Sequence, residues 1–186
     1  MAGPNGETLK CVRQAVYLGG LISCDGKAGN ELSRRLGEAG RVFDDLQKIW
    51  LHAAIPSRRK IEIYTACVTS KLLYSLESLW LLKDEKRRLD AFHYRCLRKL
   101  QRIPCSYISR ISNADVLKQG GAHTLSQSLE QRQKALYIRV AQQTDSSLVK
   151  MVTCDSEGQP IKWSANRRRG RPRQRWAHSV HKLMQT

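Results

Sequence analysis

The spacing of apolar residues constrains the fold of this chain more than any other feature of its sequence. Between residues 30 and 103, apolar side chains recur every three or four positions, which is the period of an amphipathic helix. This pattern predicts helices over residues 30–53, 57–82 and 84–102, with prolines ending the first and the third. The second helix has apolar residues on more than one side, so we expect it to lie buried at the centre of a helical domain.

The two ends of the chain have other patterns. Residues 12–24 contain short β-branched and aromatic runs around a Gly-Gly pair, which predicts a β-hairpin or two short strands. A short helix is expected over residues 113–119, and the capping-box pair Thr124 and Gln127 opens a longer one. The expected fold class is therefore mainly α: a small N-terminal β-hairpin, a helical bundle, and a basic, partly disordered C-terminal tail.

The charge balance indicates the kind of partner. The chain has 33 Lys and Arg against 16 Asp and Glu, a formal net charge of +17 and a pI near 10.1. Such a surface attracts polyanions, and nucleic acid is favoured over an anionic membrane surface. Apolar runs long enough for a membrane helix or a secretory signal are absent from the sequence. We therefore expect nucleic acid as partner, no membrane, and a place in the nucleus or in a cytoplasmic ribonucleoprotein.

Candidate catalytic and metal sites are weak. The acidic doublet Asp44-Asp45 resembles the metal-binding carboxylates of a polymerase, but it lies inside a helical pattern, where adjacent side chains diverge by roughly 100°. The six cysteines form no Cys-x-x-Cys pair, and His178 and His181 have no Cys or carboxylate companion close by. We expect no catalytic residue, no metal site and no cofactor in this chain.

Two groups of arginines are candidate nucleic-acid contacts. The third predicted helix carries arginines opposite its apolar stripe, where they could follow a phosphate backbone or form an ordinary solvated face. The C-terminal tail contains Arg-Gly-Arg-Pro, which resembles the core of an AT-hook, while a nuclear localisation signal and unselective phosphate binding are the alternatives. A tryptophan after this run could stack on a base or pack into the domain. The residues concerned are Arg87, Arg95, Arg98 and Arg102, and then Arg167, Arg168, Arg169, Gly170, Arg171, Pro172, Arg173, Arg175 and Trp176.

Several motifs, in their order along the chain, resemble the region that follows the palm in LINE-type (non-LTR) retrotransposon reverse transcriptases. Each motif alone is weak, and the shared order and spacing carry the resemblance. The segments are Tyr17–Ser23 with Asp25-Gly26, Lys60–Tyr64, Leu72–Trp80, Arg88–Phe92, Arg95–Arg98, Ile111–Asn113 and Gly170–Trp176. Two positions depart from the family pattern: Ser75 stands where glycine is usual, and residues 136–140 lack the family's Gly-His-Val.

The resemblance implies four regions. Residues 1–26 would be a primer-grip-like hairpin with Tyr17, Leu18, Gly19 and Gly20 at the nucleic acid. Residues 27–143 would be the thumb, 144–166 a linker, and 167–186 the basic tail. The parent family consists of RNA-directed DNA polymerases, whose catalytic motifs lie upstream, so the chain should bind an RNA–DNA hybrid, DNA or RNA beside a palm without polymerising alone. The alternatives are a stand-alone DNA-binding protein that uses the AT-hook-like tail, and an inert decay product with no selected activity.

The same resemblance implies that the hairpin has lost its natural neighbours. The outer edges of a two-stranded sheet then carry unpaired backbone groups. We therefore expect a poorly anchored N-terminus. The oligomeric state does not follow from the sequence.

Overall fold

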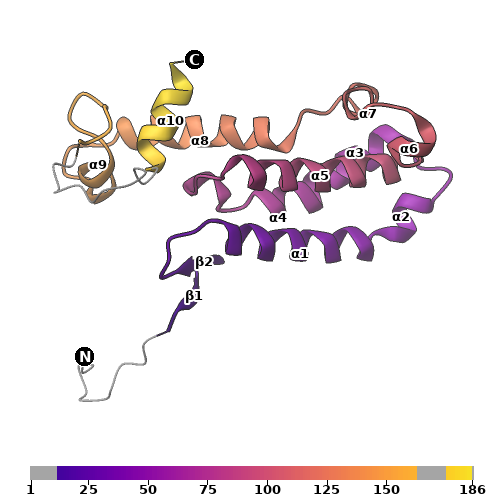
Figure 1. The fold of residues 1–186 in the computed structure, drawn as a ribbon, viewed down its shortest axis with the longest axis horizontal. Helices are drawn as coiled ribbons and strands as arrows, with labels where there is room; N and C mark the ends of the chain where they lie inside the picture. Colours follow the sequence, from indigo (N-terminus) through magenta and orange to yellow (C-terminus); the bar gives the residue numbers. More distant parts are fainter. Residues whose placement is uncertain (1–11, 163–174, 186) are drawn as a thin grey trace.

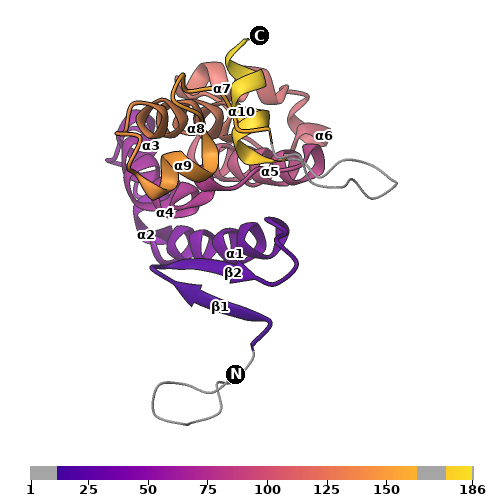
Figure 2. The ribbon, with the colours of Figure 1, turned by 90° about the vertical axis from the view of Figure 1, so that its left-hand side faces the viewer.

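The computed structural model describes residues 12–162 and 175–185, and it is mainly α with one small antiparallel sheet. Figure 1 shows α1, then α3 to α5, then α8 as successive layers, with α10 lying across α8. The hairpin lies beyond the outer side of α1, far from the C-terminus (Figure 2). The main elements are β1 (Gln14–Tyr17), β2 (Gly20–Ser23), α1 (Gly29–Asp45), α3 (Ser57–Tyr64), α4 (Ser70–Leu73), α5 (Lys83–Leu100) and α8 (Leu125–Ala141). Shorter helices are α2 (Gln47–Leu51), α6 (Ser106–Ser109), α7 (Asn113–Gly120), α9 (Leu148–Thr153) and α10 (Trp176–Met184).

The expected β-hairpin is present. Val16 pairs with Leu21 and Tyr17 with Gly20, so the turn consists of Leu18 and Gly19 alone. Both turn residues have positive φ, 47° and 78°, which matches the twist that a two-residue hairpin turn requires.

The predicted apolar stripes form the main core. Leu32, Ala39 and Phe43 of α1 are buried with Leu72 of α4 and Leu89 of α5 in one cluster. Burial of such stripes is what stabilises short helices in proteins, because helix propensity alone is too weak. A second, smaller cluster joins α8 to the C-terminal part of the chain through Tyr137, Cys154, Ala177 and Val180.

The predicted central helix over residues 57–82 is shorter than expected. Helix α3 continues through a π-helical turn, Thr65–Thr69, into α4, and the helical backbone ends after Leu73. Tyr74 leaves the helical region with ψ of 127°, and Ser75 takes a left-handed φ of 66°. This is the position where the resemblance expects glycine, and a left-handed residue ends a right-handed helix. A 3₁₀ turn, Leu76–Ser78, follows.

Other predicted boundaries also move. The helix expected over 30–53 breaks at Leu46 and ends at Leu51. Helix α5 begins at Lys83, and Glu85 reaches back to accept a hydrogen bond from the Leu82 amide at 2.7 Å, so Asp84 belongs to the first turn and is not the cap. The predicted capping box is confirmed, since Thr124 accepts from the Gln127 amide at 3.2 Å.

The predicted linker and tail contain ordered structure. Helix α9 lies within residues 144–166, and a β-bridge joins Cys154 to Pro160. Helix α10 lies within residues 167–186 and packs on α8. The Tyr137 hydroxyl of α8 donates to the carbonyl of Gly158, between α9 and α10, at 2.8 Å. The sequence did not indicate α9, because that helix is short and lies among polar residues.

Candidate nucleic-acid interface

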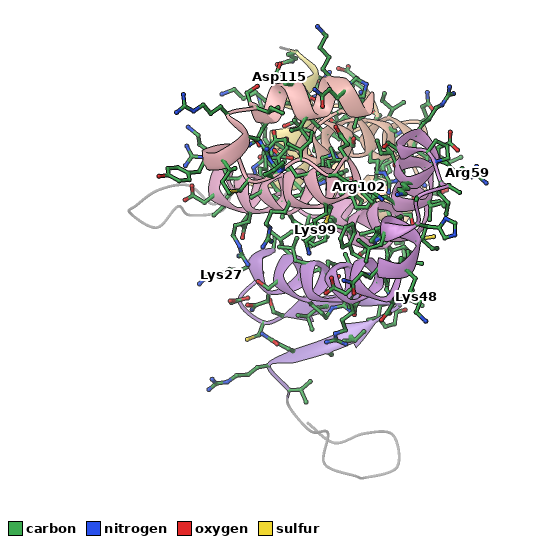
Figure 3. The ribbon with its side chains drawn as sticks, turned by 90° about the vertical axis from the view of Figure 1, so that its right-hand side faces the viewer. Lys27, Lys48, Arg59, Lys99, Arg102 and Asp115 are labelled. Carbon is green, nitrogen blue, oxygen red and sulfur yellow. The ribbon has the colours of Figure 1, made fainter. Side chains whose placement is uncertain are left out.

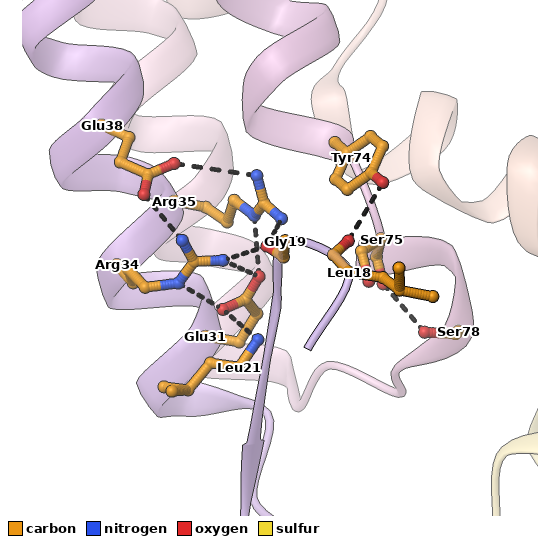
Figure 4. Close-up of polar contacts among 10 residues, drawn as sticks. All are labelled: Leu18, Gly19, Leu21, Glu31, Arg34, Arg35, Glu38, Tyr74, Ser75 and Ser78. Carbon is orange, nitrogen blue, oxygen red and sulfur yellow. Dashed lines mark hydrogen bonds and ion pairs between the residues drawn. The ribbon is translucent and has the colours of Figure 1, made fainter. Parts of the chain in front are cut away.

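The hairpin turn is fastened to α1 by a buried ionic cluster (Figure 4). Glu31, which is 1% exposed, accepts hydrogen bonds from Arg34 and Arg35 and from the backbone amide of Leu21 at 3.1 Å. Both arginines also donate to the carbonyl of Gly19. Burial by itself raises the pKa of Glu31, but these hydrogen bonds together lower it below the ordinary value. The cluster therefore keeps Glu31 ionised and fixes the turn.

The turn has a second anchor on the segment after α4. The Tyr74 hydroxyl donates to the carbonyl of Leu18 at 3.2 Å, and the Arg35 guanidinium lies 4.8 Å from the centre of the Tyr74 ring. A Cβ atom at Gly20 would come within 3.0 Å of the Ser75 hydroxyl. The turn is therefore anchored on two sides, whereas all four residues of β1 are exposed and residues 1–11 lie outside the described part of the chain.

The four predicted hairpin contacts lie in different environments. Tyr17 and Leu18 are 65% and 77% exposed, while Gly19 and Gly20 face Tyr74 and Ser75. The arginines nearest the turn are already committed to Glu31 and Gly19. This surface offers apolar and aromatic groups and few free cations, so the prediction that it contacts nucleic acid stays a prediction.

Arg98 does not belong to the interface that we expected. It is 8% exposed, and its guanidinium donates to the carbonyls of Pro104 and Ile111 at 3.0 and 2.7 Å and to the Asn113 side chain at 3.0 Å. Every one of these acceptors comes from the segment after α5. Arg98 therefore holds that segment against the helix and is not available to a phosphate.

The other three predicted arginines of this group are exposed. Arg87 forms an ion pair with Asp84 at 3.1 Å. Arg102 lies beyond the end of α5 with a φ of 56° and donates to the carbonyl of Leu51 at 3.2 Å. Arg95 lies on the side of α5 that faces α1. These three arginines therefore lie in three different environments and do not form the continuous row that we predicted.

A groove between α1 and α5 gathers cations that can meet a phosphate. It has a volume of about 460 Å³, with Leu36, Phe43 and Phe92 among its apolar lining and Arg95 and Lys99 as its cations. The Lys99 ammonium lies 5.6 Å from the centre of the Phe43 ring, and Figure 3 shows Lys99 and Arg102 on the same side of the molecule. Asp44 also lines the groove, yet neither cation forms an ion pair with any residue that the structure describes.

The α1 wall of the groove is smooth. Gly37 and Gly40 lie in the interior of α1 with ordinary negative φ, where glycine costs about 1 kcal/mol relative to alanine. A Cβ atom at Gly37 would meet nothing within 4 Å, and one at Gly40 would only touch Phe92 at 4.0 Å. Packing within the described chain therefore does not explain why glycine, rather than alanine, occupies these two positions. Both glycines leave the backbone of α1 open to the groove.

Two cations of this surface were missed by the sequence reading. Arg88 donates to the Ser33 hydroxyl of α1 at 3.0 Å, and Lys99 lines the groove. Residues 88, 95 and 99 are separated by seven and four positions, which places them along one side of α5, whereas Arg102 follows the end of that helix. This spacing is visible in the sequence and could have identified these cations, but it gives a different set of residues from the row that we predicted.

The C-terminal candidates lie partly outside the described residues, which exclude Arg167 to Arg173. Arg175 is exposed just before α10. Trp176 is half-buried, and its indole donates to the carbonyl of Glu77 at 2.8 Å beside Tyr137. Of its two predicted roles, the structure shows packing into the domain rather than a ring free to stack on a base.

Chemistry of other kinds finds little support. Asp44 and Asp45 lie in the last turn of α1 and are exposed. Burial raises the pKa of the Cys96 thiol to about 12, so this thiol in the groove wall is protonated and a poor nucleophile. Within residues 12–162 and 175–185, no three His, Cys, Asp or Glu side chains gather as a metal site would require.

In the same residues, no helix combines the length and the apolar character that crossing a bilayer demands.

Comparison with known proteins adds no relative: no family model matches the sequence, and neither a curated protein nor a solved structure resembles the chain closely enough to count as a match.

Proposed function

We propose that this chain binds a nucleic-acid duplex along the groove between α1 and α5, as the thumb of a LINE-type reverse transcriptase would. The observation that carries the proposal is the exposed row of Arg88, Arg95 and Lys99 on α5, with Arg102 just beyond the helix, and none of these four pairs with an acid among the described residues. A helix surface that serves only solubility mixes both signs of charge. An unpaired row of cations instead favours a polyanion.

The length of the row suits a phosphate backbone. From Arg88 to Lys99 the helix rises about 16 Å at 1.5 Å per residue. Successive phosphates of one strand lie roughly 3.4 Å apart along a duplex axis, so the row spans about five of them. The open backbone at Gly37 and Gly40 lets a strand approach α1 closely while the cations of α5 meet its phosphates from the other wall.

The arrangement of the hairpin supports the family part of the proposal. Two segments that resemble family motifs, Tyr17–Ser23 and Leu72–Trp80, contact each other through Tyr74 and the Leu18 carbonyl, although 56 positions separate these residues. In this proposal the chain holds an RNA–DNA hybrid, DNA or RNA beside a palm of the same polymerase family. It works in the nucleus or in a cytoplasmic ribonucleoprotein.

The test measures affinity for an RNA–DNA hybrid, an A·T-rich duplex and a G·C-rich duplex across a salt series. The double variant Arg95→Gln/Lys99→Gln should bind all three at least about ten-fold more weakly and lower the salt slope by about two, because it removes two phosphate contacts. The matched control Lys71→Gln/Arg139→Gln removes the same charge from exposed positions on α4 and α8.

Each outcome has one meaning. Preference for the hybrid together with selective loss in the groove variant supports the thumb. Equal losses in both double variants would show that net charge alone drives binding, and the groove would then be the wrong site. Preference for the A·T duplex that Arg169→Ala/Arg171→Ala abolishes would favour the stand-alone DNA-binding alternative.

A further inference from the structure

A second hollow lies between the hairpin turn and the segment after α4. It has a volume of about 450 Å³ and takes its walls from four places: the hairpin, Glu31 of α1, the Tyr74–Leu79 turn, and Leu136 of α8. Tyr17, Leu18 and Ile22 line it from the hairpin side, and each is at least 60% exposed. The anchored turn gives this hollow a fixed shape, because Arg34, Arg35 and Tyr74 hold the two adjacent carbonyls of the turn.

The charge of this hollow is opposite to that of the molecule. Its lining contains no Lys or Arg but two glutamates, although the chain has 33 basic residues. Three other hollows in the described chain each include at least one basic side chain. Glu31 is neutralised by its two arginines, so Glu77 supplies the unpaired charge.

Glu77 lacks a partner for its side chain. Its Oε2 atom is shielded from solvent and accepts no hydrogen bond, and none of the ion pairs among the described residues includes its carboxylate. A half-buried carboxylate without a donor is costly, and a cation that reached it would remove the cost. A phosphate would be repelled at the same place, which argues against nucleic acid on this face.

The apolar rim points to a polypeptide as the occupant. Tyr17, Leu18 and Ile22 are exposed beside the hollow on a hairpin of only eight paired residues. A two-stranded sheet is marginal by itself, and a patch of this kind beside a hollow marks an interaction surface. A second copy of the chain is a poor candidate, because each copy carries +17.

We infer that the hollow bounded by the hairpin turn and Glu77 is a docking site for a polypeptide segment that places a lysine or arginine against Glu77 and apolar side chains over Tyr17, Leu18 and Ile22. This site is separate from the α1/α5 groove, and it stands whether or not the groove binds nucleic acid.

The test uses the full chain and three labelled nine-residue peptides of alternating threonine and valine, with arginine, glutamate or norleucine at the centre. Fluorescence anisotropy measures binding. The arginine peptide should bind more tightly than the other two, and Glu77→Gln should weaken it about ten-fold while leaving the norleucine peptide unchanged. Glu77→Lys should reverse the preference towards the glutamate peptide. Glu157→Lys makes the same charge change at an exposed position and should alter nothing.

The inference is overturned if arginine and glutamate peptides bind the natural chain equally, or if Glu157→Lys has the effect expected of Glu77→Lys. It is also overturned if no peptide binds and Glu77→Lys instead raises affinity for a nucleic-acid duplex. Circular dichroism checks the fold of each variant. If Glu77→Lys does not fold, two measurements still test the inference. One is the loss of affinity in the Glu77→Gln variant, and the other is the difference in affinity between the arginine and norleucine peptides on the natural chain.

Discussion

Acid should destabilise this protein through one buried histidine. His93 is 4% exposed and lies between the hydroxyl of Tyr64, 2.9 Å from Nδ1, and the carbonyl of His123, 3.1 Å from Nε2. A carbonyl can only accept, so Nε2 carries the proton and Nδ1 accepts from Tyr64. A protonated ring would turn Nδ1 into a second donor. Burial lowers the pKa of His93 from 6.5 to about 4.

The size of the effect follows from this shift. In the unfolded chain the ring has its ordinary pKa, so between pH 6.5 and 4 the unfolded state binds the proton and the folded state does not. Stability from His93 is therefore present above pH 6.5 and is lost as the pH falls through this window. The pKa of His93 falls from 6.5 to about 4 on folding, and each pKa unit corresponds to about 1.36 kcal/mol. The free energy of unfolding should therefore fall by about 3 kcal/mol by pH 4.

The assay compares free energies of unfolding in urea, followed by circular dichroism, for the natural chain and His93→Gln between pH 7 and pH 4. The contributions of other titrating groups are common to both proteins and cancel in the difference. That difference should shrink by about 3 kcal/mol towards pH 4. A constant difference for His93→Gln would refute the assignment of a neutral, buried ring.

Three further substitutions test individual parts of the fold. Arg98→Met should lower the free energy of unfolding by about 3 kcal/mol, since it removes the hydrogen bonds by which the buried guanidinium holds the segment after α5, whereas the exposed Arg95→Met should change it by less than about 0.5 kcal/mol in the same urea titration. Ser75→Gly should raise the melting temperature by a few degrees, because it removes roughly 1 kcal/mol of left-handed strain; an unchanged or lower value would contradict this. Glu31→Gln should speed hydrogen exchange at the Leu21 amide and cost about 3 kcal/mol, because two arginines lose their carboxylate; unaltered exchange would show that the ionic cluster does not hold the turn.

The sequence predicted the fold class because local signals agree with the tertiary structure in most places. The stripe of α1, the capping box at Thr124 and the hairpin around Gly19-Gly20 are all confirmed. The helix over 57–82 failed for a specific reason. Its apolar period continues past the point where the backbone turns at Ser75, and periodicity carries no information about the sign of φ.

The candidate site was predicted less well, because residue type does not reveal burial. Arg98 looked like a phosphate contact, yet carbonyls from the following segment enclose it. Lys99 and Arg88 were overlooked, although their helical spacing with Arg95 is visible in the sequence. The hollow at Glu77 depends on segments that are brought together from four parts of the chain, so no local pattern could have indicated it.

Helix α1 connects the two proposed surfaces. Its first two turns hold Glu31, Arg34 and Arg35, which fix the hairpin turn beside the acidic hollow, and the next turns hold Gly37 and Gly40, which line the basic groove. From Glu31 to Gly40 the helix rises about 14 Å at 1.5 Å per residue, and a helix of this length packed on α4 and α5 bends little. A polypeptide in the hollow and a nucleic acid in the groove would therefore be held at a fixed separation along one helix. The opposite charges of the two surfaces prevent either ligand from occupying the other's place.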